Sequence, residues 1–136
     1  MSRDGLKVTT LLLTKLLTGY YFGRVIKPHR HQAMMYSVVV NLRSPKDWRL
    51  KVQEFVARLE DRFDGRLLLL VALPSPSDLL YDSNVLVVLD DIRPGDLEAV
   101  VSLAPEDVNP LVVPSGDRDA IDAFLLKGGL RIGHKG

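Results

Sequence analysis

The chain has 136 residues, of which 46% are hydrophobic and 26% are charged, proportions that are normal for one globular domain with its own core. It contains no cysteine, which excludes a disulfide framework and thiolate metal sites and is compatible with the cytoplasmic location that we expect. No apolar run approaches the roughly 20 residues needed to cross a bilayer, so we expect no membrane association.

The net charge of +1 conceals an uneven distribution of charge along the chain. Residues 1–51 contain ten Lys or Arg and two Asp, a net +8, whereas residues 52–136 contain eight basic and fifteen acidic residues, a net −7. A basic segment on an acidic body is either an arm that binds nucleic acid or a segment that folds back onto the body. We favour the intramolecular interpretation over a nucleic-acid partner, because the polar faces of ordinary elements are often basic.

We interpret residues 1–43 as a basic N-terminal extension. The first predicted element, a helix, lies within it. Apolar residues at loosely helical spacing predict this helix over residues 6–20, with its end near Gly19. The apolar side of this helix is broad, so we expect it to be covered by the rest of the chain or by another copy.

Two short strands are expected after this helix, over residues 20–27 and 35–42. The connector between them contains His29 and His31, which suggest a metal site. Two histidines without a nearby carboxylate or cysteine are an incomplete ligand set, so we do not expect a metal there.

A helix is predicted to start at Ser44-Pro45 and to end near residue 63. Ser44 is a capping residue, Pro45 suits the first helical position, and Asp47 lies three residues after the cap, which is a variant of the capping box. Apolar residues then recur at helical spacing and indicate one buried stripe. The stripe consists of Trp48, Val52, Phe55, Val56, Leu59 and Phe63.

Residues 67–73 and 85–89 are two apolar runs joined by a polar turn. The first run is apolar at every position and is bounded by Pro74 and Pro76, which is typical of a strand buried on both faces. The second run repeats the pattern. We therefore expect a pair of strands in the middle of a sheet, with any reactive side chains at the strand ends.

A short helix is expected after the strand pair, capped by Asp96, with Leu97, Val100 and Val101 on its inner side. Pro105 ends this helix, and a third strand follows over residues 108–113.

The proline at position 110 removes one backbone donor from that third strand and predicts an edge position or a bulge. A last helix is expected from Asp117 to Gly128-Gly129, with Leu130 and Ile132 in a final short strand. Its inner side consists of Ile121, Phe124 and Leu125. The order of elements predicts an α/β sandwich around a small mixed sheet.

The strand Arg66-Leu-Leu-Leu-Leu-Val71, the turn after it and Tyr81-Asp-Ser-Asn-Val-Leu-Val-Val-Leu-Asp-Asp91 together resemble a family. They are similar to the minimal archaeal and bacterial nucleotidyltransferases of the DNA polymerase beta superfamily. The resemblance covers residues 44–136 and implies a nucleotidyltransferase-like α/β sandwich. The small number of Asn, Gln and Met residues favours a thermophilic source.

In that family an Asp-x-Asp pair and a third acid hold two Mg²⁺ ions, which need carboxylate oxygens. The resemblance places these acids at Asp82, Asn84 and Asn109, so only one carboxylate remains. Asp82 is then the only family-equivalent acid left for a metal. Asp78, Asp90, Asp91 and Asp107 are the candidates for displaced acids.

A Gly-Ser turn in that family lets backbone amides approach the nucleotide triphosphate. The resemblance places Ala72-Leu73 at this turn, with Ser75 and Ser77 as candidate substitutes for the missing serine. The resemblance thus makes these four residues the candidate nucleotide-binding positions. We expect Asp82, Asn84 and Asn109 to meet near the turn at residues 74–80.

Two hypotheses follow from the altered site. The first is a catalytically inactive domain that binds a nucleotide or a protein partner and for which we expect no cofactor. The second is an active Mg²⁺-dependent enzyme that moves a nucleoside monophosphate from a nucleoside triphosphate to a protein or small molecule.

For the extension, either translation starts at Met34 or Met35, or the apolar residues of the extension pack on the domain or in a homo-oligomer.

Overall fold

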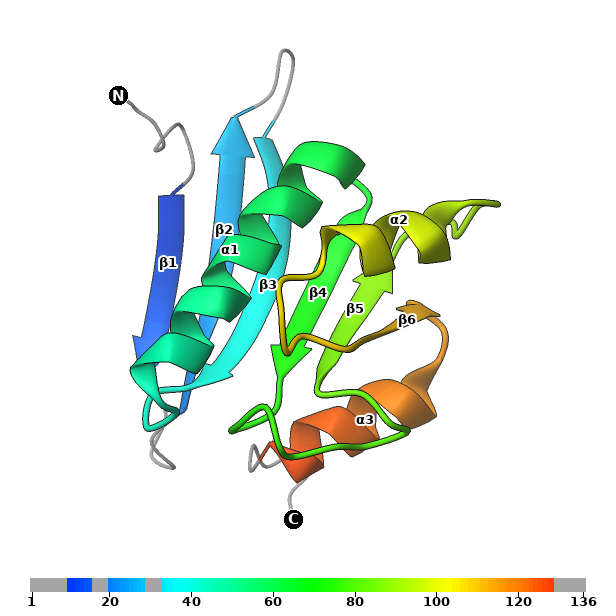
Figure 1. Cartoon of the computed structure of the whole chain (residues 1–136). Helices are drawn as coiled ribbons and strands as arrows, with labels where there is room; N and C mark the ends of the chain where they lie inside the picture. Colours follow the sequence, from blue (N-terminus) through cyan, green and yellow to red (C-terminus); the bar gives the residue numbers. More distant parts are fainter. Residues whose placement is uncertain (1–9, 16–19, 29–32, 129–136) are drawn as a thin grey trace.

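A six-stranded mixed sheet runs through the part of the chain that the computed structural model describes, which is residues 10–15, 20–28 and 33–128 (Figure 1). The strands lie side by side in chain order. Neighbouring strands are antiparallel except for the pairs β3/β4 and β5/β6, which are parallel. The strands are β1 (Thr10–Lys15), β2 (Tyr20–Pro28), β3 (Ala33–Asn41), β4 (Leu67–Ala72), β5 (Val85–Leu89) and β6 (Pro110–Pro114), and the helices are α1 (Lys46–Phe63), α2 (Asp96–Leu103) and α3 (Arg118–Lys127).

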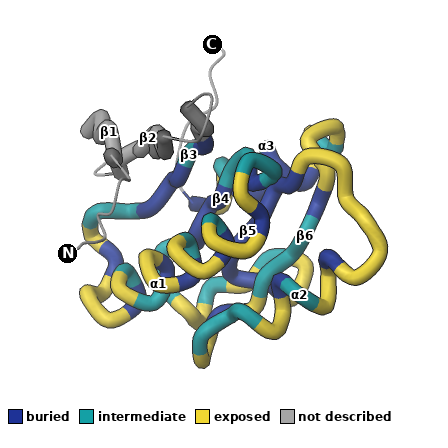
Figure 2. Tube along the Cα trace, turned by 90° about the horizontal axis from the view of Figure 1, so that it is seen from above, coloured by how far each residue is buried: buried dark blue, intermediate teal, exposed yellow. Residues whose placement is uncertain are grey.

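The helices divide the structure into three layers, with α1 and α2 on one face of the sheet and α3 on the other (Figure 2). Each parallel strand pair is joined through a helix, as parallel pairing requires: α1 connects β3 to β4, and α2 connects β5 to β6. None of the helices in the described part of the chain is long and apolar enough to span a membrane. The mixed α/β class expected from the sequence is confirmed.

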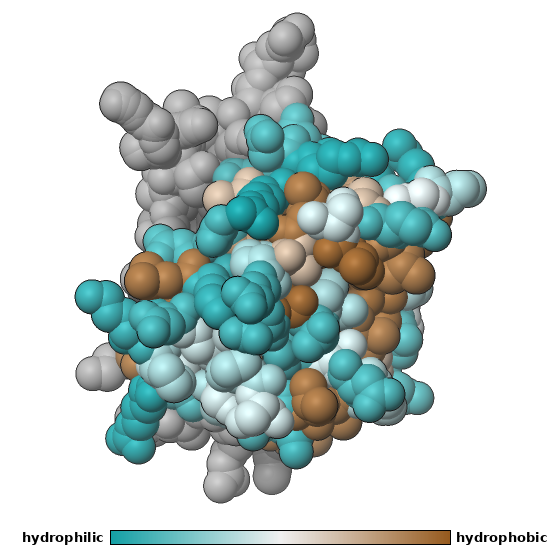
Figure 3. All heavy atoms as spheres, in the orientation of Figure 1, coloured by the Kyte–Doolittle hydropathy of each residue, from teal (hydrophilic) through white to brown (hydrophobic). Residues whose placement is uncertain are grey.

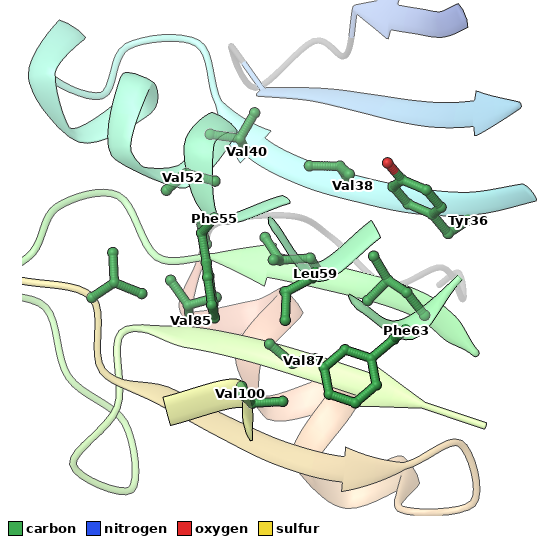
Figure 4. Close-up of a cluster of buried hydrophobic side chains, with 14 of the residues drawn as sticks. Tyr36, Val38, Val40, Val52, Phe55, Leu59, Phe63, Val85, Val87 and Val100 are labelled. Atoms are coloured by element: carbon green, nitrogen blue, oxygen red, sulfur yellow. The ribbon is translucent and has the colours of Figure 1, made fainter. Parts of the chain in front are cut away.

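Helix α1 forms because its apolar residues recur at helical spacing, and it buries that stripe against the sheet. Figure 4 shows Phe55 and Leu59 between the helix and Val85 and Val87 of β5. A phenylalanine in such a position contributes about 3 to 5 kcal/mol relative to alanine. Five residues of the predicted stripe are buried and the sixth, Val56, is half-buried. The buried residues are Trp48, Val52, Phe55, Leu59 and Phe63.

Strands β4 and β5 form the antiparallel pair expected inside the sheet. All five residues of β5 are buried, whereas Leu68 and Leu69 of β4 are half-buried. Helices cover both faces of this pair, which explains why alternation between apolar and polar residues is absent.

Strand β6 lies at an edge of the sheet, as Pro110 indicated. The backbone N–H and C=O of Asn109 both bond to Asn84, so they face β5. Backbone groups alternate along a strand, so residues 111 and 113 also face β5, and Pro110, Val112 and Pro114 face the open edge. Two of these three residues lack an N–H, so this edge is a poor template for another strand.

The predicted last helix is confirmed as α3. Asp117 is its N-cap and accepts a hydrogen bond from the Ala120 N–H at 3.2 Å. Ile121 and Phe124 are buried, and Leu125 is half-buried. The final strand expected at residues 130–132 lies outside the described residues.

The helix expected over residues 6–20 is wrong where the structure describes that segment, because Thr10–Lys15 is strand β1. A run of leucines between threonines suits a strand as well as a helix, and pairing with β2 supplies the backbone bonds. The other two strands of the expected extension are confirmed as β2 and β3. Strand β3 pairs directly with β4, so the sheet continues into the extension and is larger than predicted.

The capping box expected at the start of α1 is also wrong. Pro45 occupies the N-cap position, and no side chain caps the helix. The Ser44 side chain is buried, and its Oγ has no hydrogen-bond partner among the described residues. Proline in the cap position moves the helix start one residue past the position that the sequence pattern indicated.

Helix α2 differs from its prediction in its cap and in its inner side. Its N-cap is Gly95, in the left-handed conformation with φ of 87°, and Asp96 is the first helical residue. Val100 is fully buried, whereas Leu97 and Val101 are each 53% exposed. The inner side of α2 is therefore narrower than the apolar pattern suggested.

Candidate functional site

Asn84 is the best-connected polar side chain at the end of the sheet where the family resemblance places a site. It directly precedes β5 and is fully buried. Its Nδ2 donates hydrogen bonds to the carbonyl oxygens of Pro76, at 3.1 Å, and Asp107, at 2.8 Å. Its Oδ1 accepts a hydrogen bond from the backbone N–H of Asn109 at 2.9 Å. One carboxamide therefore ties the β4–β5 connection to the segment that leads into β6.

The backbone around Asn84 is equally engaged. Its N–H donates to the Asn109 carbonyl at 3.0 Å, and its C=O accepts from the Leu73 N–H at 2.9 Å. The Leu73 carbonyl accepts from the Trp48 indole Nε1 at 2.8 Å. Ala72 and Leu73, the positions aligned with the Gly-Ser turn, are both buried. The Leu73 N–H that would approach a triphosphate is already bonded.

Asp82 lies in a tight turn next to this network. Leu80 and Ser83 exchange two backbone hydrogen bonds, at 2.8 and 3.0 Å, which close a two-residue hairpin. Both central residues are left-handed, with φ of 55° for Tyr81 and 62° for Asp82. This turn type strongly prefers Asn and Gly, so a tyrosine there carries backbone strain on the order of 1 kcal/mol. Asp82 is exposed.

The two candidate serines lie in the same connection between β4 and β5. Their Oγ atoms are 3.0 Å apart, and Ser75 Oγ also donates to a carboxylate oxygen of Asp78 at 3.2 Å. Ser75 is half-buried and Ser77 is exposed. These hydroxyls lie beside a carboxylate, which is an unfavourable neighbour for a phosphate group.

The backbone carbonyl and the side-chain carboxylate of Asp107 make different contacts. Its carbonyl accepts the bond from Asn84, and its carboxylate forms an ion pair with Lys51 Nζ at 2.7 Å. The hydrogen bond that Lys51 donates to Asp107 is the main cause that raises the pKa of Lys51. The backbone of Asp107 is left-handed, with φ of 74°. The candidate displaced acid is thus paired with a lysine.

A second polar cluster, which the sequence did not predict, lies at the opposite end of β4 and β5. Arg66 directly precedes β4 and donates two hydrogen bonds to the carboxylate of Asp96, at 2.9 and 3.0 Å. Arg66 also donates to the carbonyl of Asp91, and the Arg93 N–H donates to Asp96 at 2.7 Å. The Arg66 hydrogen bonds lower the pKa of Asp96 from 3.8 to about 2. An arginine next to a wholly apolar strand was the only signal in the sequence.

The structure brings Asn84 and Asn109 together, through the Asn109 backbone, and leaves Asp82 exposed two residues before Asn84. These residues do not fit a pair of Mg²⁺ ions, because the Asn84 oxygen already accepts an N–H and Asp82 supplies one carboxylate. Within residues 10–15, 20–28 and 33–128, no group of three or more His, Cys, Asp or Glu side chains could hold a metal ion. We therefore derive no chemical step through Mg²⁺.

Comparison of the chain with protein-family models gave no match, and comparisons with curated proteins and with solved structures gave none either.

Proposed function

We propose that residues 44–136 form a nucleotidyltransferase-like domain that does not transfer nucleotides and serves as a cytoplasmic binding module for a nucleotide or for another protein. The order helix, strand, strand, helix, strand, helix over residues 46–127 supports the resemblance to that family.

The observation that carries the proposal is the environment of Asn84. The position that corresponds to the second metal-binding acid of the family holds a neutral amide, buried and bonded on both sides. A carboxylate at this position would place a negative oxygen against the carbonyls of Pro76 and Asp107, at a high electrostatic cost. The surrounding backbone is therefore arranged for an amide.

A binding role is supported by what this end of the sheet exposes. Leu79 and Tyr81, in the same connection, are 48% and 59% exposed, although each is large and apolar or aromatic. Tyrosine is enriched among the residues that dominate binding energy in protein interfaces. The exposed Leu79 and Tyr81 side chains therefore suit the binding of another molecule.

A transfer assay tests the proposal. The purified full-length protein is incubated with labelled nucleoside triphosphates and either Mg²⁺ or Mn²⁺, with Asp82→Ala as the matched variant. We expect no labelled product on the protein or on added acceptors, and no difference between the two proteins. Transfer by the unmodified protein that Asp82→Ala abolishes would contradict the proposal and favour the active-enzyme hypothesis.

Nucleotide binding is measured separately, by calorimetry with and without Mg²⁺. Binding without transfer supports a nucleotide-binding module, and the absence of both supports a protein-binding module. Asn84→Ala is measured in parallel, because it removes the hydrogen bonds that hold the β4–β5 connection in place. It shows whether nucleotide binding depends on the structure of that connection.

A further inference from the structure

The connection between β4 and β5 ends in a projecting element, residues 78–83, which we call the Tyr81 hairpin. Leu80 packs against the apolar cluster under α3, whereas its neighbours Leu79 and Tyr81 are 48% and 59% exposed. Figure 3 shows apolar side chains among hydrophilic ones along the lower margin of the molecule, where this connection lies in Figure 1. The hairpin is thus anchored by one leucine and presents two large side chains to solvent.

The Tyr81 hairpin is fixed in place before any partner binds. Two backbone hydrogen bonds between Leu80 and Ser83 close it, and the bond from Asn84 to Pro76 fixes the chain that leads into it. A surface that is already ordered loses little conformational entropy on association. This hairpin is therefore suited to be an anchor in an interface.

The Tyr81 hairpin carries two acidic side chains, Asp78 and Asp82, and no basic one. Residues 67–92 contain four Asp and no Lys, Arg or His. Among the ion pairs of the described residues, none involves Asp78 or Asp82, which lie in the hairpin. These two carboxylates repel phosphate groups and attract basic surfaces. The hairpin therefore fits a basic protein surface better than a nucleotide.

The chain itself carries such a surface, because residues 1–51 have a net charge of +8 and residues 52–136 a net charge of −7. Arg43 and Lys46, at the start of α1, are exposed basic residues of that segment. Two acidic hairpins repel each other, so the hairpin of one copy must contact a different surface of the second copy. We propose that the Tyr81 hairpin of one copy binds the basic segment around Arg43 and Lys46 of a second copy.

This inference rests on the proposed function, because it assigns the partner of the binding module. The contact joins two different surfaces, so it occurs either twice in a two-fold dimer or once between neighbours in a ring or chain of copies. Apolar burial of Tyr81 and Leu79 supplies the affinity, and the opposite charges supply orientation and a strong dependence on salt.

Sedimentation equilibrium of the full-length protein, over a wide concentration range and at low and high salt, tests the proposal. We expect concentration-dependent association that weakens as salt rises. Tyr81→Asn should weaken association at least tenfold, which corresponds to about 1.4 kcal/mol. Asparagine favours the left-handed backbone of this turn, so the hairpin should remain folded while it loses the ring. Leu97→Asn is the matched control, because Leu97 is 53% exposed on α2 and lies outside the hairpin.

A charge exchange makes the test specific for the two surfaces. The variant D78K/D82K has two basic surfaces and R43E/K46E has two acidic ones, so we expect each alone to be monomeric. An equimolar mixture of the two should associate again, because each hairpin then meets a surface of opposite charge.

A protein that stays monomeric at low salt and high concentration would overturn the inference, and so would a mixture of the two charge variants that does not associate. Association that Tyr81→Asn leaves unchanged, or that Leu97→Asn weakens equally, would also overturn it. These failures differ from failure of the proposed function, which appears as nucleotide transfer whatever the oligomeric state.

Discussion

The two ends of the β4–β5 pair are held to neighbouring segments by different kinds of polar interaction. At both ends a buried polar side chain ties the strands to the segments that follow them. Asn84 does so with a neutral amide, and Arg66 with Asp96 does so with an ion pair. Both side chains of the ion pair are largely buried, with 18% and 5% exposure. We call Asn84 and its hydrogen-bond partners the neutral cluster, and Arg66, Asp96 and their partners the ionic cluster. The neutral cluster lies at the end of the sheet where the family resemblance places metal-binding acids.

The difference follows from the groups that each side chain meets. Around Asn84 there are two carbonyl oxygens and one N–H, and only an amide presents both donors and an acceptor to such a mixture. Around Asp96 there are only donors, from Arg66 and the Arg93 N–H, which suit a carboxylate. We therefore expect the stability supplied by the first cluster to be independent of pH and that of the second to depend on it.

The largest effect is expected when the neutral cluster is given a charge. Asn84→Asp should lower the free energy of unfolding by about 4 kcal/mol at pH 7, because it buries a carboxylate against two carbonyl oxygens. This environment raises the pKa of the new carboxyl group, so its stability penalty should shrink as the pH falls and the group becomes protonated. Urea unfolding at pH 7 and pH 4 measures both effects.

Asn109→Asp is the control for that experiment. Asn109 is exposed and bonds to Asn84 through its backbone, so its stability should change by less than about 0.5 kcal/mol. Equal losses in the two variants would show that the Asn84 amide has no special role. Recovery of Asn84→Asp on addition of Mg²⁺ would favour a metal site at this end of the sheet.

A smaller loss is expected from neutralising the ionic cluster. Asp96→Asn should cost about 3 kcal/mol at neutral pH, because Arg66 then lacks its buried counter-charge. The folded pKa of Asp96 is about 2 instead of 3.8, so its contribution is complete above pH 4 and is lost as the pH falls toward 2. Denaturant unfolding between pH 7 and pH 2 should show this loss in the natural protein and its absence in the variant.

Asp91→Asn is the matched control for Asp96→Asn, because Asp91 pairs with Arg93 at 3.1 Å on the exposed surface. Its effect on the free energy of unfolding should be within about 0.5 kcal/mol. A pH profile that is the same for the natural protein and Asp96→Asn would contradict the assignment of the acid-sensitive step to the ionic cluster.

A still smaller effect is expected at the surface ion pair beside the neutral cluster. Lys51→Ala should lower the melting temperature by less than about 2 °C, and less at high salt, because the Asp107 carboxylate is 55% exposed. Thermal unfolding at two salt concentrations measures it. A decrease of the melting temperature by more than about 5 °C would mean that the neutral cluster depends on the Asp107 carboxylate as well as on its carbonyl.

The smallest effect is expected at Ser44, a third buried polar side chain. Its Oγ has no hydrogen-bond partner among the described residues, so Ser44→Ala removes a buried hydroxyl at no loss of bonding. The free energy of unfolding should change by less than about 0.5 kcal/mol or should rise. A decrease of about 1 kcal/mol, which is typical of a lost helix cap, would instead support the capping role that the sequence indicated.

The sequence by itself determined the elements whose signals are local. The stripe from Trp48 to Phe63 indicates a helix whatever surrounds it, and the unbroken apolar run of residues 85–89 indicates a strand covered on both faces. Pro110 cannot donate to a neighbouring strand, so one residue restricted β6 to an edge position or a bulge, and β6 lies at the edge.

Only the tertiary structure decided the features that depend on distant partners. The leucines of residues 10–15 suit a helix or a strand, and pairing with β2 selects the strand. The family resemblance places Asn84 at the position of a metal-binding acid, whereas its bonds to Pro76, Asp107 and the Asn109 backbone reach 8 to 25 residues along the chain. A hydrogen bond joins groups that are close in space, and a local pattern of residue types carries no information about which distant carbonyl or N–H the fold will bring there.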